Sequence, residues 1–162
     1  MKITWNGLTD KGSVREANED SVYLNGDIVS MQDNFQSAVY KGDITGNVLC
    51  FAVADGMGGH EAGEIASRMT LEMLSDEISR NGARFLKDPE LIKTSITGIS
   101  GEINRYAAST AKWGMGTTLV GLIFNDEKFF VYNVGDSRVY ILRDGYLSQK
   151  TRDHSLVQQV GG

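Results

Sequence analysis

The sequence predicts a domain of the α+β class, in which helices pack on antiparallel sheet. Apolar residues recur every three or four positions through the middle of the chain, which is the period of an amphipathic helix. β-Branched and aromatic runs, separated by short turns, lie on both sides of that region and are typical of strands. This order favours segregated helices over an alternating parallel fold. The 162 residues are one domain's worth of chain.

The N-terminal part of the chain predicts short strands. Residues 2–8 alternate apolar and polar side chains, as a strand with one solvated face does. A polar cluster at 15–20 leads into a short strand at 21–24. Residues 25–46 contain many Asn, Asp and Gly residues, which predict turns around a weak strand near 38–40.

A continuous apolar run at 48–54 predicts a strand buried on both faces, and it ends in the carboxylate of Asp55. Burying an unpaired ion costs on the order of several kcal/mol, so Asp55 must meet a cation, several donors or solvent. Capping of the next helix is the simpler alternative. Gly56, Gly58 and Gly59 follow, and they allow the backbone to approach a bound ion or anion closely.

Two amphipathic helices are predicted next. Apolar residues keep helical spacing from 62 to about Arg80, where Asn81-Gly82 predicts a stop. A second helix begins after Asp88-Pro89, because proline is favoured in the first turn, and its isoleucines continue to Ile103.

The last third of the chain predicts an antiparallel meander. Its β-branched and aromatic runs alternate with turns, and they cover residues 117–124, 128–134, 138–142 and 146–148. A short helical pattern opens at Asp153 and continues to Gly161.

Composition excludes several classes of protein. A net charge of −5 without a Lys/Arg-rich run argues against a nucleic-acid partner. Cys50 is the single cysteine, so a disulfide framework is excluded. It lies inside a predicted apolar strand, as a small core residue does. Because no apolar segment approaches about 18 residues and the N-terminus lacks a signal-peptide pattern, we expect a cytoplasmic protein without a membrane partner.

Acidic residues collect at predicted strand ends. Asp55 ends one strand, Glu19 and Asp20 precede another, and Asp136 lies in a third turn. Each alone could be a turn or capping residue, but four such charges on one rim would repel one another. Hard divalent ions such as Mg²⁺ or Mn²⁺, bound through carboxylate and carbonyl oxygens, would relieve that repulsion.

Arg15 lies four residues before Glu19, and its guanidinium is planar, permanently charged and a donor of several N–H groups. A guanidinium can donate paired hydrogen bonds to a phosphate, although a surface ion pair with Glu16 or Glu19 is the common alternative. A metal pair with a phosphate-binding Arg suits phosphate-ester hydrolysis, in which the metals activate a water that attacks phosphorus in line.

Five short motifs occur in this chain in the same order as in one known protein family. They are Arg15-Glu16-Ala17-Asn18-Glu19-Asp20, Asp55-Gly56-Met57-Gly58-Gly59-His60, Gly114-Met115-Gly116-Thr117-Thr118-Leu119, Gly135-Asp136-Ser137-Arg138 and Asp153-His154-Ser155-Leu156-Val157. With these motifs the chain resembles the metal-dependent serine/threonine protein phosphatases of the protein phosphatase 2C (PPM-type) family, in its bacterial form. The resemblance implies a partial four-layer α-β-β-α sandwich with antiparallel sheets.

The resemblance also implies a role for each matching residue. Arg15 would bind the substrate phosphate, Glu19 would ligate one metal, and Asp55 would bridge both. The remaining positions carry supporting roles: the Gly56 carbonyl on the other metal, Asp136 on a third and weaker metal, Asp20 beside the ligand set, and residues 153–160 at the start of a mobile flap. Many eukaryotic members have His, proposed as general acid, where this chain has Met57, so we do not transfer that role to His60.

The implied reaction is hydrolysis of phosphoserine and phosphothreonine in proteins, with two Mn²⁺ or Mg²⁺ ions and a possible third. The partners would be phosphorylated proteins, substrates of Ser/Thr kinases in signalling. The family's late Asp ligands have no counterpart in residues 1–162, so the resemblance implies that they would follow Gly162. We therefore expect residues 1–162 to be the N-terminal two thirds of one catalytic domain, impaired when isolated.

Other functional classes fit less well. The Gly56-x-Gly58 pattern before a helix resembles a dinucleotide loop, but its third glycine would fall at Glu61, and Lys-Ser/Thr is absent after Gly63. A zinc protease motif fails because no second His follows His60 by four residues. A non-catalytic, phosphatase-like interaction module stays open.

Overall fold

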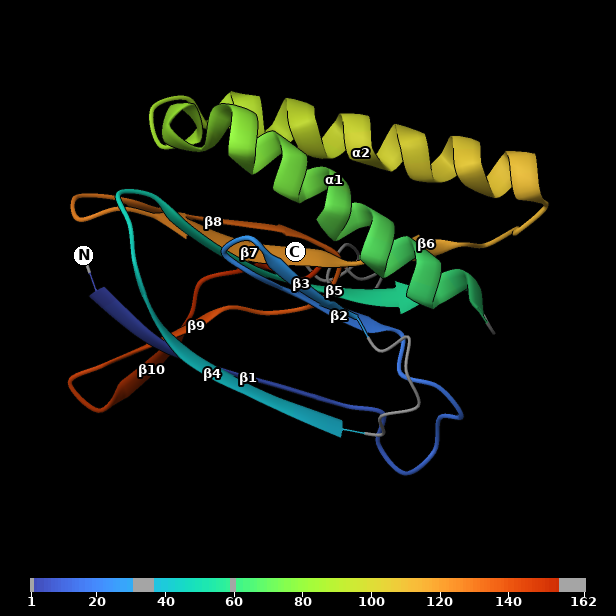
Figure 1. The fold of residues 1–162 in the computed structure, drawn as a ribbon, viewed down its shortest axis with the longest axis horizontal. Helices are drawn as coiled ribbons and strands as arrows, with labels where there is room; N and C mark the ends of the chain where they lie inside the picture. Colours follow the sequence, from blue (N-terminus) through green and yellow to red (C-terminus); the bar gives the residue numbers. More distant parts are fainter. Residues whose placement is uncertain (1, 31–36, 59–60, 155–162) are drawn as a thin grey trace.

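The computed structural model describes residues 2–30, 37–58 and 61–154. Within these ranges two helices cover one face of a central antiparallel sheet, and two separate two-stranded ribbons lie against its other face (Figure 1). Three layers of an α-β-β arrangement are therefore present, as the α+β prediction requires. Neither helix in the described part of the chain combines the length and hydrophobicity needed to cross a membrane.

The central sheet carries the candidate site at one end. Its strand order is β3-β2-β5-β7-β8, and every neighbouring pair is antiparallel. The strands are β2 (Asp20–Leu24), β3 (Asp27–Ser30), β5 (Leu49–Met57), β7 (Leu119–Phe124) and β8 (Phe129–Val134), while the short β6 (Gly116–Thr117) pairs with the end of β5.

The two ribbons correct the predicted strand pattern. β1 (Lys2–Asp10) pairs along its whole length with β4 (Ser37–Thr45), where the sequence predicted mostly turns. β9 (Tyr140–Arg143) pairs with β10 (Tyr146–Gln149) in a sheet of its own. The predicted meander is therefore wrong between β8 and β9, because the chain leaves the central sheet there.

The helices agree with their predicted starts better than with their predicted ends. In α2 (Pro89–Thr110) the Asp88 side chain accepts a hydrogen bond from the Glu90 N–H, as an N-cap does. α1 (Glu61–Phe85) runs past the predicted stop at Gly82. Phe85 is 1% exposed, and burying that ring outweighs the small cost of a glycine inside the helix.

The hydrophobic core lies between the helices and the central sheet, and β5 runs through it. Cys50, Ala52 and Ala54 are buried on the helix side, whereas Val53 is 39% exposed on the other. The prediction that β5 is buried on both faces is therefore wrong for its second half. That face lines an apolar cleft of about 520 Å³ between the central sheet and the ribbons.

Cys50 is a core residue, as predicted. Its Sγ lies 3.4 Å from the Tyr132 hydroxyl on β8, and burial raises the pKa of the thiol to about 12. The intervening β7 residue is Gly121, and a Cβ there would collide with the Tyr132 hydroxyl. Gly121 thus makes room for the Tyr132 side chain to reach across β7.

Candidate functional site

A polar pocket of about 200 Å³ opens where β2 begins and β5 ends. The residues that line it are Asp10, Lys11, Arg15, Ala17, Asn18, Glu19, Asp20, Asp55 and Gly56. The structure therefore brings five of the predicted site residues together, and the sixth, Asp136, lies outside this lining. Asn18 organises the entrance, because its Oδ1 accepts from the Asp20 N–H at 3.0 Å and its amide donates to Thr9 Oγ1 at 2.7 Å.

Asp20 and Asp55 occupy directly opposed positions of the β2–β5 pair. The pKa of Asp20 is raised to about 6, first by burial, then by the charge of Asp55, a hydrogen bond to it and the charge of Glu19. The three carboxylates therefore concentrate negative charge at this wall of the pocket, which a cation would relieve. Their oxygens, with the Gly56 carbonyl, are the donor type that Mg²⁺ and Mn²⁺ prefer.

Glu19 is held against the first turns of α1. Its backbone carbonyl accepts hydrogen bonds from the Gly56 N–H at 3.2 Å and from Ser67 Oγ at 2.7 Å. A Cβ on Gly63 would lie 2.5 Å from Glu19 Oε2, and a Cβ on Gly56 would collide with the Gly63 carbonyl. Gly56, predicted to admit a bound ion or anion, here admits the backbone of Gly63 in α1, and Gly63 in turn makes room for the Glu19 carboxylate.

The backbone of Asp55 is fixed by two threonines that the sequence analysis left without a role. The Asp55 N–H donates to Thr118 Oγ1 at 3.1 Å, and its carbonyl accepts from the Thr118 N–H and from Thr117 Oγ1, both at 2.9 Å. The Asp55 residue stays exposed at the pocket. The Gly116-Thr117-Thr118 motif was the available signal, but its partner lies about 60 residues away.

Arg15 is exposed and contributes to the pocket lining. Among the described residues it forms no ion pair, so the surface pairing with Glu16 or Glu19 is not what the structure contains. Its guanidinium is available to an anionic ligand. Lys11 also lines the pocket and adds a second positive charge beside it.

Asp136 lies in the turn after β8, exposed to solvent. Its neighbour Ser137 connects this turn to the pocket, because the Ser137 and Thr118 hydroxyls lie 2.8 Å apart and Thr118 holds Asp55. The predicted flap lies outside the described residues from Ser155 onward, and so does His60.

The donor set fits part of a divalent-cation site. Glu19, Asp55 and the Gly56 carbonyl supply oxygens beside one pocket. In the described part of the chain, no three His, Cys, Asp or Glu side chains are arranged so that they could hold a metal ion unaided. A divalent cation at this pocket would therefore need ligands in addition to the side chains of the described residues.

Comparisons with known proteins bear on this arrangement. The family model for protein phosphatase 2C matches residues 15–159. The chain is 40% identical over 157 residues to a serine/threonine phosphatase stp of Listeria monocytogenes, and the match covers 94% of this chain and 55% of that protein.

Solved structures give the same picture. A crystal structure of the Mycobacterium tuberculosis serine/threonine phosphatase PstP/Ppp superposes with a TM-score of 0.72 at 31% identity, covering 98% of this chain and 58% of the other. A structure of the PstP catalytic domain in complex with two manganese ions gives 0.72 at 30% identity, covering 99% and 60%. The chain thus spans little more than half of these relatives. With its motifs, its fold and these matches, the chain belongs to the protein phosphatase 2C family.

Proposed function

We propose that the protein to which this chain belongs hydrolyses phosphoserine and phosphothreonine in proteins, using two Mn²⁺ or Mg²⁺ ions. The observation that carries the proposal is the pocket at the end of β5, where Arg15, which forms no ion pair with any described residue, lies beside the carboxylates of Glu19 and Asp55. Cations and a phosphate-binding guanidinium at one pocket are what phosphate-ester hydrolysis requires.

Each residue has a distinct role in this proposal. Glu19 would hold one ion, Asp55 would hold both, and the Gly56 carbonyl would contribute to the second. When bound, such ions supply charge neutralisation and an activated water as nucleophile. Arg15 orients the substrate phosphate through paired N–H donors. Asp20, opposite Asp55 on β2, adds a third carboxylate beside the ligand set, and Asp136 would hold a third, weaker ion.

We also infer that residues 1–162 are the N-terminal part, about two thirds, of one catalytic domain. The coverage of the solved relatives supports this, since the chain spans 58% of one and 60% of the other. The proposed partners are phosphorylated proteins made by Ser/Thr kinases, and the proposed setting is signalling. A cytoplasmic location, without nucleic-acid or membrane partners, stays a prediction.

The test is phosphate release from a phosphothreonine peptide by the full-length protein, measured with Mn²⁺, with Mg²⁺ and in excess chelator. We expect turnover with either ion and none in chelator, with recovery when Mn²⁺ is restored. Undiminished release in chelator would overturn the proposal. ATP and NAD serve as comparison ligands, because binding of either without phosphopeptide turnover would support a nucleotide-binding module instead.

A non-catalytic interaction module is the second candidate. It is favoured by one observation, that the described residues contain no set of three side chains able to hold a metal unaided. Binding of the phosphopeptide in a Mn²⁺-containing buffer, with no phosphate released over many hours, would select this alternative.

A further inference from the structure

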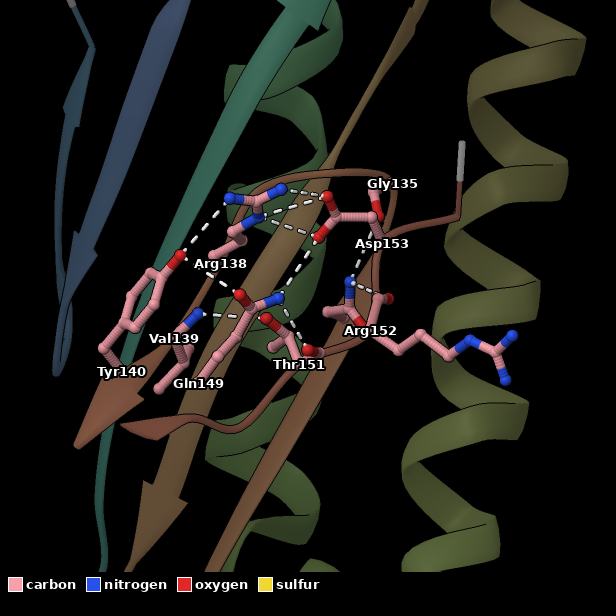
Figure 2. A network of polar contacts seen from close by, with 9 residues as sticks. Gly135, Arg138, Val139, Tyr140, Gln149, Thr151, Arg152 and Asp153 are labelled. Carbon is pink, nitrogen blue, oxygen red and sulfur yellow. Dashed lines mark hydrogen bonds and ion pairs between the residues drawn. The ribbon is translucent and has the colours of Figure 1, made fainter. Parts of the chain in front are cut away.

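The turn that carries Asp136 is anchored to a second segment, residues 149–154, by an ion pair between Arg138 and Asp153. Arg138 Nε donates to Asp153 Oδ1 at 2.9 Å and to Oδ2 at 3.1 Å, and a second guanidinium nitrogen also reaches Oδ2 (Figure 2). Asp153 is only 8% exposed. A bidentate pair of this kind fixes direction as well as distance.

The pair is supported by hydrogen bonds with two uncharged side chains, Gln149 and Tyr140. Gln149 Nε2 donates to Asp153 Oδ1 at 3.4 Å, and its Oε1 accepts from the Tyr140 hydroxyl at 3.1 Å. The same hydroxyl accepts from Arg138 Nη1 at 3.3 Å, which closes a ring of four side chains (Figure 2). The guanidinium lowers the pKa of Asp153, so this carboxylate stays ionised at neutral pH.

The opposite end of the turn is anchored to the same segment. The Gly135 carbonyl accepts from the His154 N–H at 2.9 Å, and the Gly135 N–H donates to His154 Nδ1 at 3.4 Å. Asn133 Nδ2 joins the turn to this segment, because it donates to the carbonyls of Gly135 at 3.2 Å and Arg152 at 3.3 Å.

Steric fit adds a third constraint on this turn. Gly135 has a φ of +102°, and a Cβ there would lie 2.7 Å from Thr118 Cγ2. Ser137 then bonds to Thr118, which holds the Asp55 N–H. Gly135 and Arg138 are thus both tied to residues 152–154, and Ser137 is tied to the strand-end that carries Asp55. Asp136 stands between these anchors with an exposed carboxylate.

We propose that Arg138 and Asp153 are positioning residues, which hold the Asp136 carboxylate at a fixed place relative to Asp55 and so set the affinity of the cation that Asp136 binds. This inference rests on the proposed function, because it needs Asp136 to be a metal ligand. Neither residue touches the cation or the substrate. Partners that orient a metal ligand typically contribute roughly ten- to hundredfold to metal affinity.

The experiment is Mn²⁺ titration by calorimetry on the full-length protein, with Asp153→Asn, Asp136→Asn and the double variant. We expect Asp153→Asn to weaken the Asp136-dependent binding step by roughly tenfold. In the Asp136→Asn background the same change should have no further effect on Mn²⁺ binding, because the carboxylate that Asp153 is proposed to position is already absent. Unchanged affinity in Asp153→Asn, or an equal loss in both backgrounds, would overturn the proposal.

Folding is controlled separately. Arg138→Lys keeps the charge but loses the bidentate geometry, so it should also weaken this binding step, and it carries the test if Asp153→Asn does not fold. Glu102→Gln is the matched control, since it removes the Arg105–Glu102 pair on the exposed face of α2 and should leave Mn²⁺ affinity unchanged. Equal weakening in Glu102→Gln would show a general stability effect and would overturn the positioning role.

Asp55→Asn, titrated in the same series, separates this inference from the proposed function. Wild-type Mn²⁺ affinity in Asp55→Asn would reject the metal site as a whole. Loss of binding in Asp55→Asn together with wild-type binding in Asp153→Asn would reject only the positioning role.

Discussion

Asp20 and Asp55 face one another across the β2–β5 pair, so two carboxylates share one rung of an antiparallel ladder at the wall of the pocket. Like charges placed directly opposite each other on a sheet are destabilising. Their position is tolerated here at the solvent-accessible end of the sheet, where a cation can reach both side chains.

This pairing predicts a pH-dependent stability for the metal-free chain. The pKa of Asp20 is about 6 against an unfolded value of 3.8, so the folded state binds the extra proton between these values. The free energy of unfolding should therefore fall as pH rises from 4 to 6. Asp20→Asn should flatten this dependence and stabilise the metal-free protein at pH 7 by about 1 kcal/mol, after allowance for solvent screening. Urea unfolding in chelator at several pH values measures the free energy of unfolding of both proteins. Identical dependence on pH in wild type and Asp20→Asn would contradict the prediction.

Asp55→Asn should abolish tight Mn²⁺ binding and turnover together, because a bridging ligand serves both ions. Calorimetry and phosphopeptide release measure the two effects. Asp27→Asn, at the exposed start of β3, is the control and should change neither. Wild-type metal affinity in Asp55→Asn would count decisively against the assignment.

Arg15→Ala should lower kcat/KM by roughly ten- to hundredfold, mainly through a higher KM, since it removes a charged donor to the substrate phosphate. Mn²⁺ affinity should be unchanged. The exposed Arg80→Ala on α1 controls for loss of a positive charge. A fall in kcat at constant KM would show instead that Arg15 acts only in the transition state.

Gly63→Ala should destabilise the fold by about 1–3 kcal/mol, because the new methyl group would overlap the Glu19 carboxylate and the backbone of Gly56. It should also weaken Mn²⁺ binding by displacing Glu19. Gly98→Ala on α2 is the matched control, since its added Cβ would meet no atom outside its own stretch of helix within 4 Å, and it should stabilise the helix by up to about 1 kcal/mol. Thermal melts of both variants measure the two changes in stability. Equal shifts of the melting temperature in Gly63→Ala and Gly98→Ala would contradict this prediction.

Residues 1–162 alone should bind Mn²⁺ weakly and release little or no phosphate. In the proposed function Glu19 and Asp55 would form only part of the ligand set, and an ion with fewer anionic ligands is held less tightly. Titration of the isolated chain, beside a phosphopeptide assay, measures both properties. Tight binding of two ions with turnover close to that of the full-length protein would show that these residues suffice.

The features that the sequence predicted well are those carried by contiguous residues. The apolar run of β5, the polar cluster at 15–20 and the Asp88-Pro89 helix start each depend on a few neighbouring positions, and the structure contains all three. The convergence of Arg15, Glu19 and Asp55 was predictable because the start of one strand and the end of its antiparallel neighbour lie at the same edge of a sheet.

Features set by distant partners were not predictable in the same way. β4 is a strand because β1 pairs with it, although its own pattern is weak. The helix stop expected at Gly82 depended on local propensity, which burial of Phe85 overrides. The roles of Gly63 and Thr118 arise from contacts with residues more than 40 positions away. Tertiary contacts decide such cases, because local preferences are worth only tenths of a kcal/mol.

The enclosed thiol of Cys50 has a practical consequence. With its pKa raised to about 12 and no exposed surface, it is almost entirely unionised and out of reach of alkylating reagents in the folded protein. Labelling then requires the sheet to open, so the rate of modification reports the opening equilibrium of the core at a single natural position. Slower labelling in Mn²⁺ than in chelator would register, without any added dye or tag, how much a bound cation stabilises the folded chain.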